Sequence, residues 1–179
     1  MSWAPRAGHA RPLQLILVAL CVTLGGQALA QVPAEDAVRA ALDGWRLSEA
    51  EAVVKRLPAG DARELLAARA ELMRSDAKAA VKRLDPIVAG TQGEAGYEAR
   101  VVLGRALQAL GQKQEAFAVL DVMADDYNDN TVTSARGLMW LGVGLMLTDY
   151  PKNAHRVFRE ALEKEPGLAL GKRLWADLY

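Results

Sequence analysis

Apolar residues between positions 34 and 166 recur at intervals of three and four, which is the spacing of the buried face of an α-helix. In residues 34–57 this pattern predicts two short helices, and the first of them places Val38, Leu42 and Trp45 on one face. Strict alternation of apolar and polar residues, the pattern of a half-buried strand, is almost absent. The sequence therefore predicts an all-α fold.

Polar residues mark where the predicted helices begin and end. Ser48, with Glu51 three positions later, has the form of a capping box, which predicts that the second helix starts there. Asp61 is a candidate cap for a helix that reaches about Arg74, and a partner helix is predicted at 77–88.

One short sequence, V-K-R-L, occurs twice, at 54–57 and at 81–84. Each copy follows alanines and is itself followed by a proline within two residues. Chance could produce a four-residue match in an alanine-rich helical chain, but the matching context favours the interpretation that the two copies are equivalent parts of two repeated helix pairs.

The clearest repetition lies in residues 97–130 and 135–168. Each stretch contains a Leu-Gly pair, a large residue three positions after the glycine, an alanine in the second helix, and a large residue four positions later. The small residues would let two antiparallel helices approach closely, and Gly111 would form the turn between them. The positions that carry this spacing are Leu103, Gly104, Leu107, Ala116, Leu120, Leu141, Gly142, Leu145, Ala154, Phe158, Ala161 and Pro166.

This spacing resembles the template of the tetratricopeptide-repeat (TPR) family, whose unit is a helix-turn-helix of roughly 34 residues. The resemblance implies a right-handed α-solenoid of antiparallel helix pairs. It predicts approximate units at 34–58, 61–90, 97–130 and 135–168, and the start of another at 169. Because 169–179 repeats a first-helix pattern without a capping helix, we expect a domain at 31–179 that is truncated at its C-terminus.

A narrower resemblance rests on residues 158–162, Pro166 and residues 175–179. These are similar to the N-terminal repeats of bacterial exported TPR proteins, some of which carry a peptidase-MA-like metalloprotease domain downstream.

The first thirty residues have the features of a signal peptide. Arg6 and Arg11 precede an apolar run at 13–24, and Ala28-Leu29-Ala30 has the small-x-small form of a cleavage site. An uncleaved membrane anchor, as in a tethered assembly factor, is the alternative, although the run is short for a hydrocarbon core of about 30 Å. We expect cleavage and export, most plausibly to the periplasm, with no stable membrane insertion afterwards.

Composition and charge exclude several classes of function. Cys21, the sole cysteine, would leave with the leader, so a disulfide framework and a thiolate metal site are not expected. The precursor has 22 basic and 22 acidic residues, and removal of Arg6 and Arg11 leaves 20 against 22. We expect no nucleic-acid partner, because such binding normally requires a basic excess.

Catalytic and metal-binding patterns are weak. His155 would be the one histidine after cleavage, so the two-histidine motif of zinc proteases is absent, and we expect no catalytic residue and no cofactor. Residues 125–130, D-D-Y-N-D-N, are rich in oxygen ligands but lack the glycine and glutamate of a calcium loop. We interpret them as an inter-repeat loop, with Thr131 or Ser134 capping the next helix.

The resemblance implies a concave groove lined by the first helix of each repeat, which would bind a protein or peptide partner. The groove residues carried over by position are Glu98, Arg105, Gln108, Arg136, Met139, Val143, Met146, Arg173 and Asp177. Met139 and Met146 could instead belong to the core. The sequence thus predicts a non-catalytic interaction scaffold of the cell envelope. The alternative is the recruiting arm of an exported metallopeptidase whose catalytic domain lies outside this chain.

Overall fold

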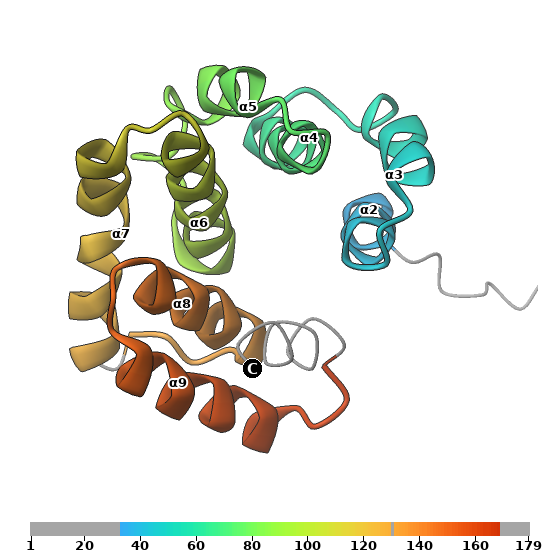
Figure 1. Cartoon of the computed structure of the whole chain (residues 1–179). Helices are drawn as coiled ribbons and strands as arrows, with labels where there is room; N and C mark the ends of the chain where they lie inside the picture. Colours follow the sequence, from blue (N-terminus) through green and yellow to red (C-terminus); the bar gives the residue numbers. More distant parts are fainter. Residues whose placement is uncertain (1–32, 130, 169–179) are drawn as a thin grey trace, which may run out of the picture. The chain divides into compact units, whose positions relative to one another are not determined.

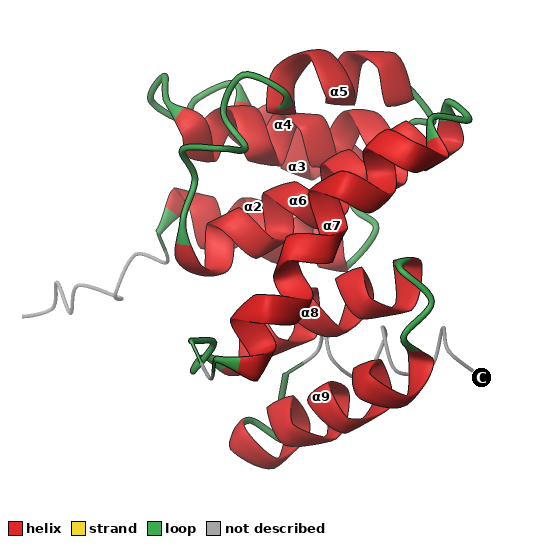
Figure 2. Ribbon diagram, turned by 90° about the vertical axis from the view of Figure 1, so that its left-hand side faces the viewer, coloured by secondary structure: helices red, strands yellow, loops and turns green. Residues whose placement is uncertain are grey.

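The computed structural model describes residues 33–129 and 131–168. The predicted leader, Asn130, and the predicted unit from 169, including Arg173 and Asp177, lie outside these residues. Within them the chain forms eight α-helices and no strand (Figure 2), which confirms the all-α prediction. The helices are α2 (Ala34–Asp43), α3 (Leu47–Val54), α4 (Asp61–Met73), α5 (Ala77–Leu84), α6 (Gly93–Ala109), α7 (Lys113–Asn128), α8 (Ala135–Leu147) and α9 (Pro151–Lys164).

The helices are arranged as four pairs that follow one another in chain order (Figure 1). α2 packs on α3, α4 on α5, α6 on α7 and α8 on α9. The first helices also form a row, because α4 contacts both α2 and α6, and α6 contacts α8. Each second helix of the first three pairs packs against the first helix of the next pair.

The same turn joins the two helices of every pair. Its central residue is Trp45, Ser75, Gly111 or Asp149, and each has a positive φ between 57° and 79°. In every turn the next residue donates its N–H to the carbonyl five residues earlier, for example Gln112 to Leu107 at 2.9 Å. This pattern is the Schellman motif, which ends one helix and starts the next with little intervening chain. The predicted turn at Gly111 is confirmed.

A fully buried alanine follows each of these turns at the same distance. Ala50, Ala80, Ala116 and Ala154 each lie five positions after the positive-φ residue, and each is 0% exposed. The residue four positions later is large and buried in every pair. The four pairs therefore share one packing register although their sequences differ.

Eleven of the twelve predicted packing residues are buried. Pro166 is the exception, since it lies exposed in the turn after α9. A Cβ at Gly142 would lie 2.6 Å from Cε1 of Phe158, and one at Gly104 would lie 2.7 Å from Cδ1 of Leu120. The prediction that these glycines allow close helix contact is confirmed.

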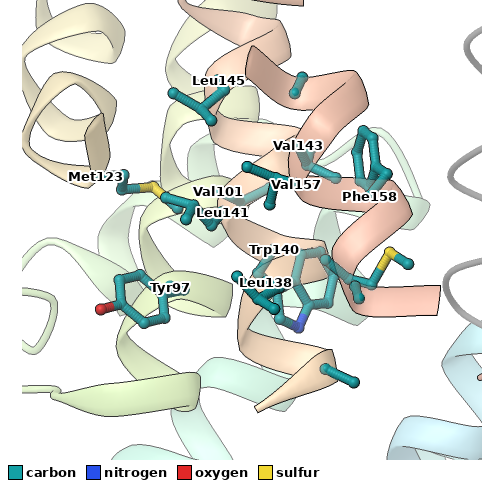
Figure 3. Packing of buried hydrophobic residues seen from close by; sticks show 14 of the residues in the cluster. Tyr97, Val101, Met123, Leu138, Trp140, Leu141, Val143, Leu145, Val157 and Phe158 are labelled. Atoms are coloured by element: carbon teal, nitrogen blue, oxygen red, sulfur yellow. The ribbon is translucent and has the colours of Figure 1, made fainter. Parts of the chain in front are cut away.

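Three apolar clusters hold the pairs together. The first unites α2 and α3 with Leu66 of α4, the second joins α4 and α5 to α6, and the third joins α8 and α9 to α6 and α7. Figure 3 shows the third cluster, where Met123 reaches α8 from α7 on one side and Phe158 lies on α9 on the other.

Two predictions at the first turn are wrong. Trp45 is 68% exposed and does not lie on the apolar face of α2, because the chain turns into the left-handed region at this residue. No capping box forms at Ser48, because α3 begins at Leu47 and its N-terminus has no side-chain cap. Glu51 pairs instead with Arg74 of the neighbouring pair.

The two V-K-R-L copies are not structurally equivalent. Val54 follows the turn residue Trp45 by nine positions, whereas Val81 follows Ser75 by six. Val54 therefore corresponds to Leu84, and both of these are buried. The two copies therefore do not follow the packing register that the four helix pairs share.

The predicted inter-repeat loop at 125–130 is mostly helical, because α7 continues to Asn128. Among the two predicted caps for α8, Ser134 takes the role, and its hydroxyl accepts a hydrogen bond from the Gly137 N–H at 2.9 Å. No group of metal-binding side chains occurs in the part of the chain that the structure covers.

Candidate functional site

Charged side chains gather on the row of first helices. Arg69 occurs in an otherwise apolar part of α4, and Glu98 occurs in a similarly apolar part of α6. Arg39 and Asp43 are one turn apart on α2, as are Glu94 and Glu98 on α6, so each pair shares a helix face. We call the following set the ionic network: Arg39, Asp43, Arg69, Glu94, Glu98 and Arg136.

Glu98 is the most deeply buried member, with a side chain that is 1% exposed. Its Oε1 accepts a hydrogen bond from Nη1 of Arg69 at 2.9 Å, and its Oε2 accepts one from Nε of Arg39 at 3.3 Å. A buried carboxylate is stable only when it is paired and hydrogen-bonded, and two arginines from two other helices supply this compensation. The site is therefore assembled by three helices, α2, α4 and α6.

Burial and charge act in opposite directions on Arg39. Burial alone would lower the pKa of its guanidinium, but the charge of Glu98, the hydrogen bond to it, and the nearby Glu35 raise the pKa above the ordinary value. Arg39 therefore remains a cation and compensates Glu98.

The network continues from α4 to α8 through Asp43. Its Oδ1 pairs with Nη2 of Arg69, and its Oδ2 lies 3.5 Å from Nη2 of Arg136. Nε of Arg136 lies 3.4 Å from Oε1 of Glu94. The other oxygen of Glu94 accepts a hydrogen bond from the hydroxyl of Ser134 at 2.9 Å, so the cap of α8 also belongs to the network.

Two donors on α8 form no hydrogen bond in the part of the chain that the structure covers. They are Nε of Arg136 and the indole Nε1 of Trp140, and both are buried. The ring of Trp140 lies under the guanidinium of Arg69, 5.1 Å from Cζ to the ring centroid, as a cation–π contact. Buried donors are normally hydrogen-bonded, so this region of α8 is the least satisfied part of the network.

The described groove residues fall into three groups, which are buried, partly buried and exposed. Glu98, Met139 and Val143 are buried, and Met139 is 0% exposed within the third apolar cluster. Met146 and Gln108 are partly buried, and Gln108 donates a hydrogen bond to the carbonyl of Leu147.

Arg105 is the exposed member of the described set, and Arg136 is partly buried in the network. Sequence reasoning therefore identified two residues of the network, Glu98 and Arg136, but missed the others. The signal that could have found Arg69 is a single arginine between apolar residues on a helix.

A separate open pocket of about 420 Å³ lies between the start of α6 and the later part of α7. Tyr97 and Arg100 line it together with Val122 and Asp126. Burial raises the pKa of the Tyr97 phenol, so this group is neutral near pH 7.

Comparison of the sequence with protein-family models and curated proteins, and of the structure with solved structures, finds no match. None of the helices in residues 33–129 and 131–168 is both long enough and apolar enough to cross a bilayer.

Proposed function

We propose that this protein is a non-catalytic interaction scaffold with a TPR-like solenoid architecture, which binds a protein or peptide along the row of first helices. The observation that carries the proposal is the concentration of six charged side chains from α2, α4, α6 and α8 on one row of helices. A shared packing register in four successive pairs supports the solenoid, because stacked repeats generate extended binding surfaces.

Two arginines of the row of first helices reach solvent, since Arg105 is exposed and Arg136 is partly exposed, and a guanidinium can bind a carboxylate bidentately. Arg105 lies seven residues after Glu98 on α6, which is close to two helical turns, so it extends the same face toward solvent.

The proposal includes export to the bacterial periplasm after cleavage of residues 1–30. Its support is the sequence alone, namely the basic start, the apolar run and the small-x-small site. Amino-terminal sequencing of the exported protein tests it, because retention of Met1 would exclude cleavage.

Site-specific photo-crosslinking in envelope extracts tests the binding face. A photo-reactive residue replaces Arg105 on the first-helix row, and in the matched control it replaces Arg159, an exposed arginine of α9. We expect crosslinks to a defined partner from position 105 and few from position 159. The same crosslinked proteins from both positions would contradict binding along the first helices.

A further inference from the structure

The ionic network joins helix pairs that are not neighbours. In a stack of repeats each unit contacts mainly the adjacent units. Here Asp43 of the first pair reaches Arg136 of the fourth pair, 93 residues later in the chain. Arg39 of the first pair similarly reaches Glu98 of the third.

Apolar packing does not account for the link between the first and fourth pairs. Val38 and Leu42 of α2 belong to the first apolar cluster, whereas Leu138 and Leu141 of α8 belong to the third. In the described residues, the Asp43–Arg136 pair therefore links α2 directly to α8. Its closest N–O distance is 3.5 Å, longer than the pairs that Arg69 makes with Asp43 and Glu98.

The two partners of this long contact differ in what they lose when it breaks. Asp43 keeps its close pair with Arg69 on α4. Arg136 keeps Glu94, whose Oε1 lies 3.4 Å from its Nε, although this contact is not a hydrogen bond. Breaking the contact with Asp43 thus leaves a partly buried guanidinium with one carboxylate where it had two.

We propose that the Asp43–Arg136 pair is an ionic latch and that an acidic side chain of the partner opens it by replacing Asp43 at Arg136. One carboxylate is exchanged for another, so the charge balance around Arg136 is preserved. This inference rests on the proposed binding face and adds the chemistry of the partner, which is an acidic segment.

Distance measurements between α2 and the start of α8 test the latch in the full chain. Ala40→Cys on α2 and Thr133→Cys before α8 are exposed positions for two spin labels, and Cys21→Ser makes both labels unique. We expect one short distance at low salt and longer distances at about 1 M NaCl, where the screening length falls to roughly 3 Å. Arg136→Gln should give the longer distances already at low salt.

A matched variant controls for the loss of an arginine. Arg159 is exposed, pairs with Glu163 on its own helix α9 and lies outside the network, so Arg159→Gln should behave as the wild type. Circular dichroism checks that each variant keeps its helix content. A label distance that responds neither to salt nor to Arg136→Gln would overturn the latch.

A capped oligoglutamate peptide tests the carboxylate exchange, with oligoglutamine at equal ionic strength as its control. We expect only oligoglutamate to lengthen the distance, and Arg136→Gln to weaken its binding by roughly tenfold or more. A latch that opens with salt but ignores oligoglutamate would overturn the exchange. If position 105 instead gives no crosslinks while oligoglutamate still lengthens the label distance, only the scaffold proposal is contradicted.

Discussion

At position 142 the absence of a side chain lets α9 approach α8. A Cβ there would lie 2.6 to 2.9 Å from three atoms of the Phe158 ring, which is itself 0% exposed. Gly142→Ala would gain about 1 kcal/mol of helix propensity but would overpack a ring that cannot move. We expect a net loss of about 1–2 kcal/mol in the free energy of unfolding, measured by urea denaturation.

Gly144, two positions later on α8, faces α7 instead of α9 and is the matched control. A Cβ there would meet Sδ and Cε of Met123 at 2.7 and 2.9 Å, but this end of a methionine is flexible. Gly144→Ala should therefore leave the free energy of unfolding nearly unchanged. If Gly142→Ala is as stable as Gly144→Ala, the close packing of α8 on Phe158 is not what holds the pair together.

The single negative charge of Glu98 compensates two arginines in a dry environment. Glu98→Gln keeps the shape of the side chain but leaves Arg39 and Arg69 without their shared carboxylate. Removing one partner of a buried ion pair typically costs about 3–5 kcal/mol, so we expect a loss of that size in chemical denaturation.

Glu64 provides the comparison, because its 2.7 Å pair with Arg83 is substantially exposed. Exposed pairs contribute about 1 kcal/mol or less, so Glu64→Gln should have a small effect. If Glu98→Gln and Glu64→Gln lower the free energy of unfolding by similar amounts, the network is hydrated and is not a buried structural element.

At the scale of the element, two of the four Schellman turns allow a test in which two substitutions should change the stability in opposite directions. Trp45 and Gly111 occupy equivalent positions, both with positive φ, and most of the Trp45 side chain is in solvent. A non-glycine residue in this region costs roughly 1–2 kcal/mol. Trp45→Gly should therefore stabilise the protein by up to about 1 kcal/mol, and Gly111→Ala should destabilise it by about 1 kcal/mol.

Thermal and urea unfolding of the two variants measure both effects. Because the backbone geometry of the turns is the same, the sign of each change depends only on which residue occupies the turn. Changes of the same sign in Trp45→Gly and Gly111→Ala would show that Trp45 makes a stabilising contact that outweighs its backbone conformation.

The sequence predicted the packing of the helices at positions where a single property of the residue, such as small size, decides its place. Gly104, Gly142 and the alanines of the second helices are small because two helices meet there, and this spacing predicted the later pairs. Trp45 was wrongly placed on the apolar face of the first helix, because an aromatic residue at helical spacing resembles a core residue. In the structure a turn directs its side chain to solvent. The turn at Trp45 could not be predicted because it lacks the glycine found at 111.

At the scale of the molecule, the ionic network could not be predicted in full. Its contacts join residues 59 and 93 positions apart, and no local pattern reveals which charged helix faces will meet. Glu98 and Arg136 were placed on the correct row of helices, but their burial depends on Arg39, Asp43 and Arg69 from other pairs. Long-range ion pairs of this kind depend on how the four helix pairs are arranged and not on any one pair.

The division of the core into three clusters predicts how the molecule unfolds in parts. Phe158→Ala would leave a cavity in the third cluster at a cost of about 3–5 kcal/mol, because the ring is fully buried. In native-state hydrogen exchange we expect the amides of α8 and α9 to lose protection, because local opening follows contiguous structural units. Amides of α4 and α5 should keep theirs, since these helices pack in the second cluster, which has no residue of α8 or α9. An equal loss of protection in all these helices would instead show that the four pairs unfold as one cooperative unit.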